Sequence, residues 1–545
     1  LSLFGRLGMA WQLIVKVLVG LFLIVGIWGW WKWGEFNTWN IWARWTAAVL
    51  YFVNTYFLVT LDGGSLFIAG AYSCVPVLLW LSSRTNLYPS WWNQVVLGFV
   101  VGVAGFLDIR IIFIYLTIAS LAIVSRFWSI KIMPGILTML LVLHSFWWFP
   151  ALVNQWHGQS IDANSSQVNQ FSFVSPSHLL FWSQPHWYNN LFGDIQAVRG
   201  YLVFIPILVL LSLLTVQHPS LRFFIALTIA GLILAKGELP PGGQLYSKIL
   251  GWLPGFAGFR DPSKFEILRN LGYTGLIALL MNSVNGKWLA ILVVTLTVLV
   301  AAPAYTGKMS GMFSPPANLQ EYQMQADFLQ KQSGTFRVLW LPTKPPMGYA
   351  SQNAIWTEGM ALLKKKPFLD AVDGEYEYLN YLRSPQMPSL LSLIGVKYIV
   401  YPHPEDRKKP LHPDEIAYYA WFRNWFENQT WLKDVSFGPK LGMFEVLTYE
   451  PSNFIKLSPT RYKTNVKQAP QWLIFPESFD LGWKLNSKSA IPAYDMLNSF
   501  YVNKPGEHVV EYVPQKVLYL SIVISISITA LIMFTSYARH RVRKY

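Results

Sequence analysis

A group of charged side chains lies in the distinctive segment 238–270. Its sequence, ELPPGGQLYSKILGWLPGFAGFRDPSKFEILRN, places Arg260, Lys264 and Arg269 around the start of an apolar run. Cations at a helix N-terminus oppose the helix dipole unless an anion lies there too, and a phosphate is a natural anion for such a place. We therefore predict that Arg260, Lys264 and Arg269 bind phosphate. The alternative is local: Asp261 pairs with one of these cations and caps the following helix.

A second group of polar side chains lies among aromatic residues in segment 153–199. Aromatic rings can stack on the apolar face of a sugar, while nearby polar groups bind its hydroxyls. The predicted substrate-binding residues of this segment are His157, His178, Trp182, His186 and Trp187. The alternative is a re-entrant pair of helices whose Trp and His side chains lie at the level of the lipid headgroups.

Two carboxylates at the predicted ends of membrane helices, Asp62 and Asp108, are candidates for a general base. For each, the alternative is an interfacial cap or a local ion pair, such as Asp108 with Arg110. The sequence contains no GxxxxGK[ST], HExxH, CxxC or GxSxG motif, and no GxGxxG after a strand. It therefore gives no support to a nucleotide-driven pump, and no metal ligands are predicted.

The elements that position these residues must be largely membrane helices. The 545 residues are 53% hydrophobic, 16% aromatic and only 13% charged, with a mean hydropathy of +0.33, which excludes an ordinary soluble multidomain enzyme. The net charge of +15 comes from Lys and Arg in short loops beside apolar runs. This arrangement is the positive-inside pattern of membrane proteins and does not indicate a nucleic-acid partner.

The length of each apolar run predicts which segments cross the bilayer, since a helix needs about 17 to 25 apolar residues to do so. We predict a polytopic α-helical membrane protein with about ten or eleven transmembrane helices. The predicted spans are 10–30, 44–61, 64–82, 91–107, 110–125, 132–152, 200–216, 221–237, 267–284, 287–303 and 515–536.

Orientation follows from the basic tail after the last span, which belongs in the cytoplasm of a multi-pass protein of the cell membrane. This predicts a membrane domain over 1–303 with outer loops 153–199 and 238–266, an extracytoplasmic domain over 304–514, and a final helix with its tail over 515–545. Short strand-like runs, such as VKYIVYP and HVVEYVP, predict that the extracytoplasmic domain is α+β or rich in β-strands.

Three stretches resemble one known family. WLPGFAGFRDPSKF (252–265) is similar to the outer loop of the YfhO-like and arabinofuranosyltransferase-D-like membrane proteins of the GT-C glycosyltransferase superfamily. TAAVLYFVNTYFLVTLDGG (46–64) resembles their early helix, and 477–515 resembles the strand-rich end of their outer domain.

The resemblance implies an enzyme that moves a sugar from a polyprenyl-phosphate-linked donor to an extracytoplasmic glycan, lipid or protein acceptor. Such a reaction needs a base and a cationic clamp for the departing phosphate, and a divalent cation could share the second task. In this superfamily the base is typically an Asp in the first outer loop. The chain starts at Leu1 and lacks that loop, so we expect a preceding segment that carries the catalytic Asp. A glycan-binding or scaffold protein anchored in the membrane, or a transporter of lipid-linked glycans, are the alternatives.

Overall fold

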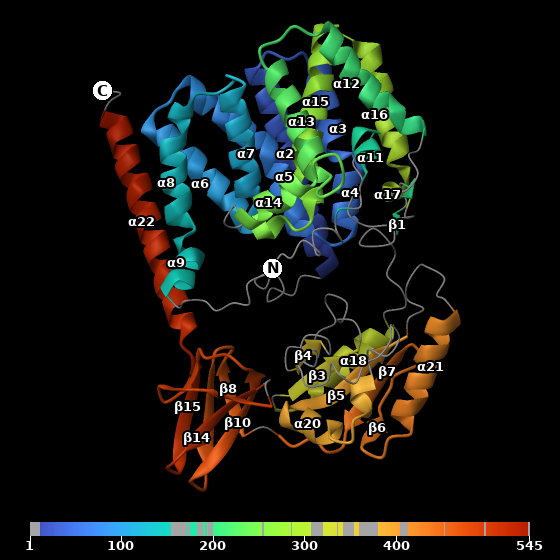
Figure 1. Ribbon diagram of the computed structural model, residues 1–545, viewed down its shortest axis with the longest axis vertical. Helices are drawn as coiled ribbons and strands as arrows, with labels where there is room; N and C mark the ends of the chain where they lie inside the picture. Colours follow the sequence, from blue (N-terminus) through green and yellow to red (C-terminus); the bar gives the residue numbers. More distant parts are fainter. Residues whose placement is uncertain are drawn as a thin grey trace. The chain divides into compact units, whose positions relative to one another are not determined.

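The computed structural model of the chain divides into two compact units, Leu1–Pro315 with Leu520–Tyr545, and Pro316–Tyr519 (Figure 1). The structure describes residues 11–153, 172, 175–181, 189–190, 193–194, 200–252, 256–284, 286–306, 320–334, 336–341, 354–358, 380–403, 413–451, 453–494 and 497–542.

The first unit is built from helices that follow the apolar runs of the sequence. Three of the described helices are long and apolar enough to cross a membrane, Leu13–Phe36, Leu66–Leu87 and Pro514–Val542, and a bent pair can act as a fourth span. Its helices are α2 (Trp11–Phe36), α3 (Ile41–Phe52), α4 (Thr55–Asp62), α5 (Leu66–Leu87), α6 (Trp91–Leu107), α7 (Arg110–Val124), α8 (Met133–Leu143), α9 (Ser145–Val153), α11 (Pro176–Phe181), α12 (Phe204–Thr215), α13 (Leu221–Ala235), α14 (Gln244–Trp252), α15 (Glu266–Ser283), α16 (Lys287–Val300), α17 (Ala302–Tyr305) and α22 (Pro514–Val542).

The predicted span 44–61 is interrupted, because α3 ends at Phe52 and α4 begins at Thr55. Asn54 caps the second helix: its side-chain oxygen accepts a hydrogen bond from the backbone N–H of Phe57 at 2.9 Å. Its amide nitrogen donates to the carbonyl of Tyr51 at 2.6 Å and to the hydroxyl of Tyr72 at 3.1 Å. A helix can break inside a membrane only where such partners satisfy the freed backbone groups.

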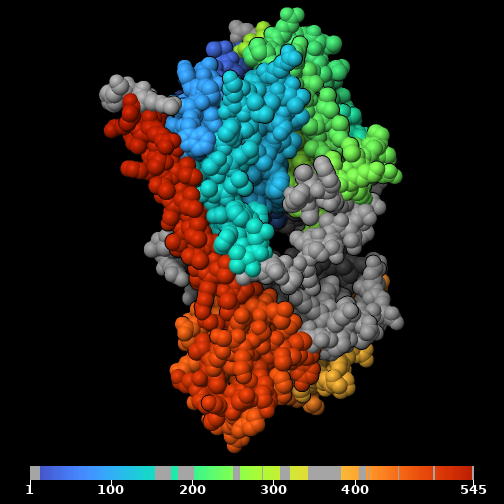
Figure 2. All heavy atoms as spheres, turned by 60° about the vertical axis from the view of Figure 1, so that its left-hand side comes forward, coloured from blue at the N-terminus to red at the C-terminus, as the bar shows by residue number. Residues whose placement is uncertain are grey.

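The predicted span 132–152 is also not straight, since Ile130–Leu143 and Ser145–Val153 meet at 60°. The carbonyls of Val142 and Leu143, freed at this bend, accept hydrogen bonds from the hydroxyl of Ser525 at 3.0 and 2.8 Å. Ser525 lies on α22, which runs beside α8 and α9 (Figures 1 and 2). The last helix thus stabilises the bend.

The second unit contains a five-stranded mixed sheet between helices. Its strand order is β4 (Ala354–Glu358), β3 (Phe336–Trp340), β5 (Val396–Pro402), β7 (Leu441–Val446) and β6 (Leu432–Asp434). Alternate strand residues face opposite cores. Leu339 and Ile399 pack with residues of α20 (Met387–Leu393) and α21 (Pro413–Glu427), while Val338 and Trp340 pack with α18 (Gln320–Lys331).

The second unit also holds a sandwich of two antiparallel sheets with a core of aromatic and aliphatic side chains, among them Phe475, Phe500 and Trp483. One sheet has the order β10 (Gln471–Ser478), β14 (Leu497–Val502), β13 (Ile491–Ala493). The other has the order β12 (Lys488–Ser489), β11 (Trp483–Leu485), β15 (Gly506–Tyr512), β9 (Arg461–Val466), β8 (Phe454–Ser458). The prediction of a strand-rich region before the last helix is confirmed.

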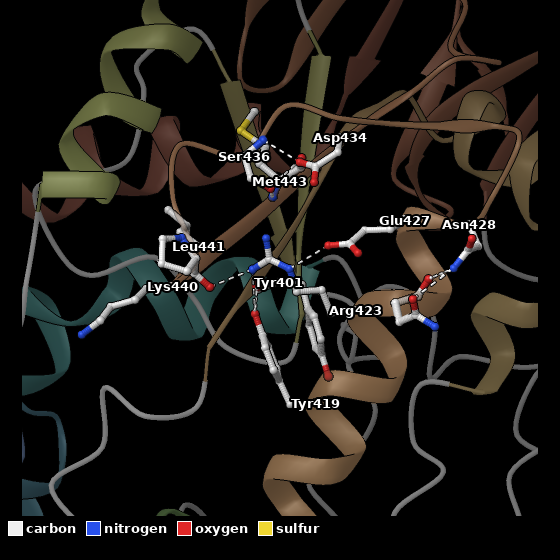
Figure 3. A network of polar contacts seen from close by, with 12 residues as sticks. Tyr401, Tyr419, Arg423, Glu427, Asn428, Asp434, Ser436, Lys440, Leu441 and Met443 are labelled. Carbon is white, nitrogen blue, oxygen red and sulfur yellow. Dashed lines mark hydrogen bonds and ion pairs between the residues drawn. The ribbon is translucent and has the colours of Figure 1, made fainter.

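A polar network fixes α21 to the mixed sheet (Figure 3). The guanidinium of Arg423 donates to Glu427 at 3.0 Å and to the carbonyl of Pro439 at 2.8 Å. The rings of Tyr401 and Tyr419 stack with their centroids 4.6 Å apart. These contacts join elements of the same fold, so we assign them a structural role.

Candidate functional site

The segment that carries the predicted phosphate ligands forms two 3₁₀ turns, Phe256–Phe259 and Pro262–Phe265, which lead directly into α15. Asp261 caps the second turn by accepting hydrogen bonds from the backbone N–H and the hydroxyl of Ser263, at 3.1 and 2.6 Å. It also forms an ion pair with the ammonium group of Lys264 at 2.6 Å, and both side chains are largely buried. The alternative prediction, a cap with a local pair, therefore describes Asp261 and Lys264.

Arg269 is enclosed one turn into α15 and is fully buried. Its guanidinium donates to the carbonyl of Leu179 and to the side-chain oxygen of Asn270, both at 2.7 Å. Glu266, also fully buried, lies 3.6 Å away as its ionic partner. The charge of Arg269 is thus compensated, and the residue ties α15 to the C-terminal end of α11.

The structure therefore separates the three predicted phosphate ligands. Arg260 is exposed, whereas Lys264 and Arg269 are buried with carboxylate partners. Of the three, Arg260 is the one whose side chain is exposed and can be reached from the surface of the unit.

Beyond Arg269 the polar side chains continue into the helix break. Asn270 donates to Asn54 at 3.5 Å, and the hydroxyl of Tyr72 donates to the carbonyl of Tyr51 at 2.8 Å. A cavity of about 30 Å³ lies between Asn54, Asn270 and Ile205 of α12, with Arg269 and Tyr273 in its wall. This space can hold a water molecule and is too small for a sugar.

Each of the two candidate bases lies at the end of a helix. Asp108 caps the end of α6 and accepts two parallel hydrogen bonds from Arg110, at 2.9 and 2.7 Å. This is the predicted local pair. Phe113, one turn further along α7, packs against Phe259 with ring centroids 6.0 Å apart, so this pair lies beside the turns that lead to α15. Asp62 is buried at the end of α4.

Two tyrosines complete the surroundings of these turns. The hydroxyl of Tyr246 donates to the carbonyl of Phe259 at 2.5 Å. Burial, and then the negative charges of Asp261 and Glu238, raise the pKa of Tyr246, which keeps its proton in place. Tyr56, near the start of α4, lies within Coulombic range of Asp261, Glu266 and Arg110.

The structure describes only some of the predicted substrate-binding residues of segment 153–199. His157, Trp182, His186 and Trp187 lie outside the described residues. His178 is buried in α11, with its Nδ1 atom 2.7 Å from the hydroxyl of Ser175. Among the described residues there is no group of three or more His, Cys, Asp or Glu side chains that could hold a metal ion.

Sequence reasoning assigned no role to Asn54, Tyr56, Glu266 or Asn270. Asn54 had a readable signal, because an Asn followed by Thr inside an apolar run is typical of a helix N-cap. Glu266 and Asn270 lie within the segment that was singled out, but their partners are set by the packing of α15 against other helices.

No protein-family model matches the sequence, and no curated protein matches it. A solved structure does match: the single-particle cryo-EM structure of the arabinofuranosyltransferase AftD from Mycobacteria. The chain has an AftD-like fold. The TM-score is 0.50 at 16% identity, over 86% of this chain and 36% of AftD. The chain thus spans about a third of the length of AftD. The similarity to arabinofuranosyltransferase-D-like proteins, predicted from segments 46–64, 252–265 and 477–515, is confirmed at the level of the fold.

Proposed function

We propose that this protein is a membrane glycosyltransferase that moves a sugar from a polyprenyl-phosphate-linked donor to a glycan, lipid or protein acceptor outside the cytoplasm. The observation that supports it is the AftD-like fold. The last turn before α15 and the first turn of that helix add a chemical reason, because each holds an ion pair within a mainly apolar helical unit. Ionisable groups among membrane helices are costly and commonly mark functional sites.

In this proposal the exposed Arg260 binds the donor phosphate, since a guanidinium can contact two phosphate oxygens at once. The Asp261–Lys264 and Glu266–Arg269 pairs hold the turn and the start of α15 in place. A base removes the proton of an acceptor hydroxyl, whose oxygen attacks the anomeric carbon. The bond from that carbon to the phosphate oxygen breaks, and the phosphate leaves with the electron pair.

The base remains to be assigned by experiment. The two candidates to test are Asp108, whose carboxylate oxygens accept hydrogen bonds from Arg110, and Asp62 at the end of α4. We further propose that residues 304–514 lie outside the cytoplasm, where they present the acceptor, and that the basic tail lies inside.

The test is transfer of labelled sugar by the full-length protein in membranes, with a panel of farnesyl-phosphoryl sugars as donors. Arg260→Gln should cost about 2 to 4 kcal/mol of transition-state stabilisation, by analogy with the loss of one oxyanion donor. Its thermal stability should stay near that of the wild type, because the side chain is exposed. Arg84→Gln, which alters an exposed arginine at the end of α5, is the matched control.

Asp261→Asn distinguishes the proposed phosphate binding by Arg260 from the capping of the turn by Asp261. It leaves the buried Lys264 without its ionic partner, so it should lower stability more than Arg260→Gln does. An Arg260→Gln protein that is folded and transfers sugar at the wild-type rate would exclude Arg260 as the phosphate ligand.

A second candidate function, a membrane-anchored glycan-binding protein, is favoured by one feature of the sandwich. Trp472 and Tyr501 face each other across β10 and β14, with centroids 5.1 Å apart, and are 54% and 45% exposed. Exposed aromatic rings can stack on sugars. If this function holds, the wild-type protein should bind a glycan but transfer no sugar from any donor in the panel. Trp472→Ala should abolish that binding.

A further inference from the structure

The sandwich of the second unit joins the last helix through a very short connection. β15 ends at Tyr512 and α22 begins at Pro514, so only Val513 separates them. The N–H of Tyr512 donates to the carbonyl of Thr460 at 2.9 Å. The N–H of Val513 donates to the carbonyl of Gly482 at 3.0 Å. The carbonyl groups of Thr460 and Gly482 therefore lie at the level of the first turn of α22.

The length of α22 indicates where this junction lies in a bilayer. α22 is apolar enough to cross a membrane and has 29 residues, so at ~1.5 Å per residue it is about 43 Å long. A bilayer with both headgroup layers is about 40 to 45 Å thick. The last turn carries Arg539, His540 and Arg541, which belong in one headgroup layer, so the first turn reaches the other. The exposed Lys516 and Tyr519 near the start of α22 are residue types that favour this layer.

The parts of the sandwich beside this junction form a surface that we call the rim, residues 456–461 and 479–482. The first range is the tip of the hairpin of β8 and β9, and the second leads into β11. Each contains one of the two carbonyls that bind the junction. Two apolar side chains of the rim are largely exposed, Leu457 at 53% and Leu481 at 58%. Such side chains gain free energy when lipid covers them.

The charges of the rim suit the same surroundings. Lys456 and Arg461 are exposed on the two sides of the hairpin tip. Cations of this kind are attracted to the phosphates of a membrane surface. The carboxylate of the rim, Asp480, accepts hydrogen bonds from the N–H of Gly482 at 2.7 Å and the hydroxyl of Tyr512 at 3.2 Å. The junction therefore engages the acidic group, while the basic groups point into the surroundings.

We propose that the rim is a membrane-binding surface that lies in the headgroup layer of the leaflet where α22 begins. Leu457 and Leu481 contact the upper part of the acyl chains, and Lys456 and Arg461 bind lipid phosphates. The partner is the phospholipid surface itself. This inference goes beyond the proposed function and does not depend on sugar transfer, since it requires only that α22 crosses the membrane.

Fluorescence quenching in nanodiscs tests this position. The full-length protein with Cys74→Ala carries one new cysteine, from Leu457→Cys or Leu481→Cys, which is labelled with the fluorophore NBD. Both positions are exposed, so the label should not disturb the fold. Phospholipids that carry a nitroxide on the headgroup quench a fluorophore that lies beside them. We expect the fluorescence of both labels to be lost in nanodiscs that contain these lipids.

The matched control is Lys504→Cys, at an exposed position of the same sandwich. Lys504 lies just before Gly506, where β15 begins, at the end of the strand away from the junction. The seven residues of β15 rise by ~3.3 Å each, which places Lys504 about 20 Å from the junction. A label there should keep its fluorescence with nitroxide lipids and lose it when iodide is added to the water.

Quenching by nitroxide lipids at both rim positions, with none at Lys504→Cys, would support the inference. Rim labels that only iodide quenches lie in water, and this result overturns it. Rim labels that neither reagent quenches are covered by protein, such as a second copy of this chain, which overturns it too. The same holds if nitroxide lipids quench only one rim position, or quench the control equally.

Discussion

The start of α15 and the end of α21 contain the same kind of interaction in different surroundings. Arg269 pairs with Glu266 on α15 with side chains 1% and 0% exposed, while Arg423 pairs with Glu427 on α21 with side chains 19% and 41% exposed. A buried charge that loses its partner has no water to replace it, whereas an exposed one does. Mutation of the pair on α15 should therefore destabilise the protein more than mutation of the pair on α21. Two predictions test this difference, and a third, on α22, is expected to have an effect between them.

The largest effect is expected for Glu266→Gln. It leaves the Arg269 guanidinium charged and buried without its ionic partner, which should cost about 3 to 5 kcal/mol. We expect little monodisperse protein in size-exclusion chromatography of the detergent-solubilised variant. A double variant, Glu266→Leu with Arg269→Leu, removes both charges and should recover part of that yield. Wild-type yield and thermal stability for Glu266→Gln alone would show that the pair contributes little.

A smaller effect is expected where α22 stabilises the bend between α8 and α9. Ser525→Ala removes the hydroxyl that donates to the carbonyls of Val142 and Leu143, and interhelical hydrogen bonds in membranes contribute about 0.6 to 1.7 kcal/mol. The thermal midpoint should fall modestly. Ser527→Ala, at an exposed position on the same helix, is the control and should leave the midpoint unchanged. Equal midpoints for the two variants would count against a stabilising role for Ser525.

The smallest effect is expected for Glu427→Gln in the network of Figure 3. Water can solvate Arg423 when its partner is neutralised, and the second contact of Arg423, to the carbonyl of Pro439, remains. The free energy of unfolding should change by less than about 0.5 kcal/mol, and added salt should reduce the change further. A loss as large as that of Glu266→Gln would mean that burial does not explain the contrast between the two helices.

The sequence predicted correctly those features that depend on residues close to one another along the chain. The strand VKYIVYP coincides with β5 (Val396–Pro402), and the Asp261 cap joins residues only two and three positions apart. Hydropathy averages over a window, so it predicted 44–61 as one span. The break at Asn54 depends on Tyr72 and on Asn270, which is 216 positions away.

The same reason limited the prediction of the site. Whether Arg269 binds a phosphate or a backbone carbonyl depends on where α11 packs. The carbonyl that it binds, that of Leu179 in α11, is 90 positions away in the sequence. Sequence reasoning singled out this segment because charges beside an apolar run are conspicuous. It could not determine which of those charges are compensated.

The packing of α15 against α13 bears on how the protein is made. The hydropathy of α15 falls short of that of the long spans such as α5 and α22, and its first four residues include the charged Glu266 and Arg269, which are costly to place in lipid. On α13, Gly231 lies against the backbone of Arg269, where an added methyl group would collide with its nitrogen. On α15, Gly275 lies equally close to the ring of Phe224. We therefore expect α13 and α15 to enter the membrane as a pair. On this view α13, which is made first, stays at the translocon until α15 has been synthesised.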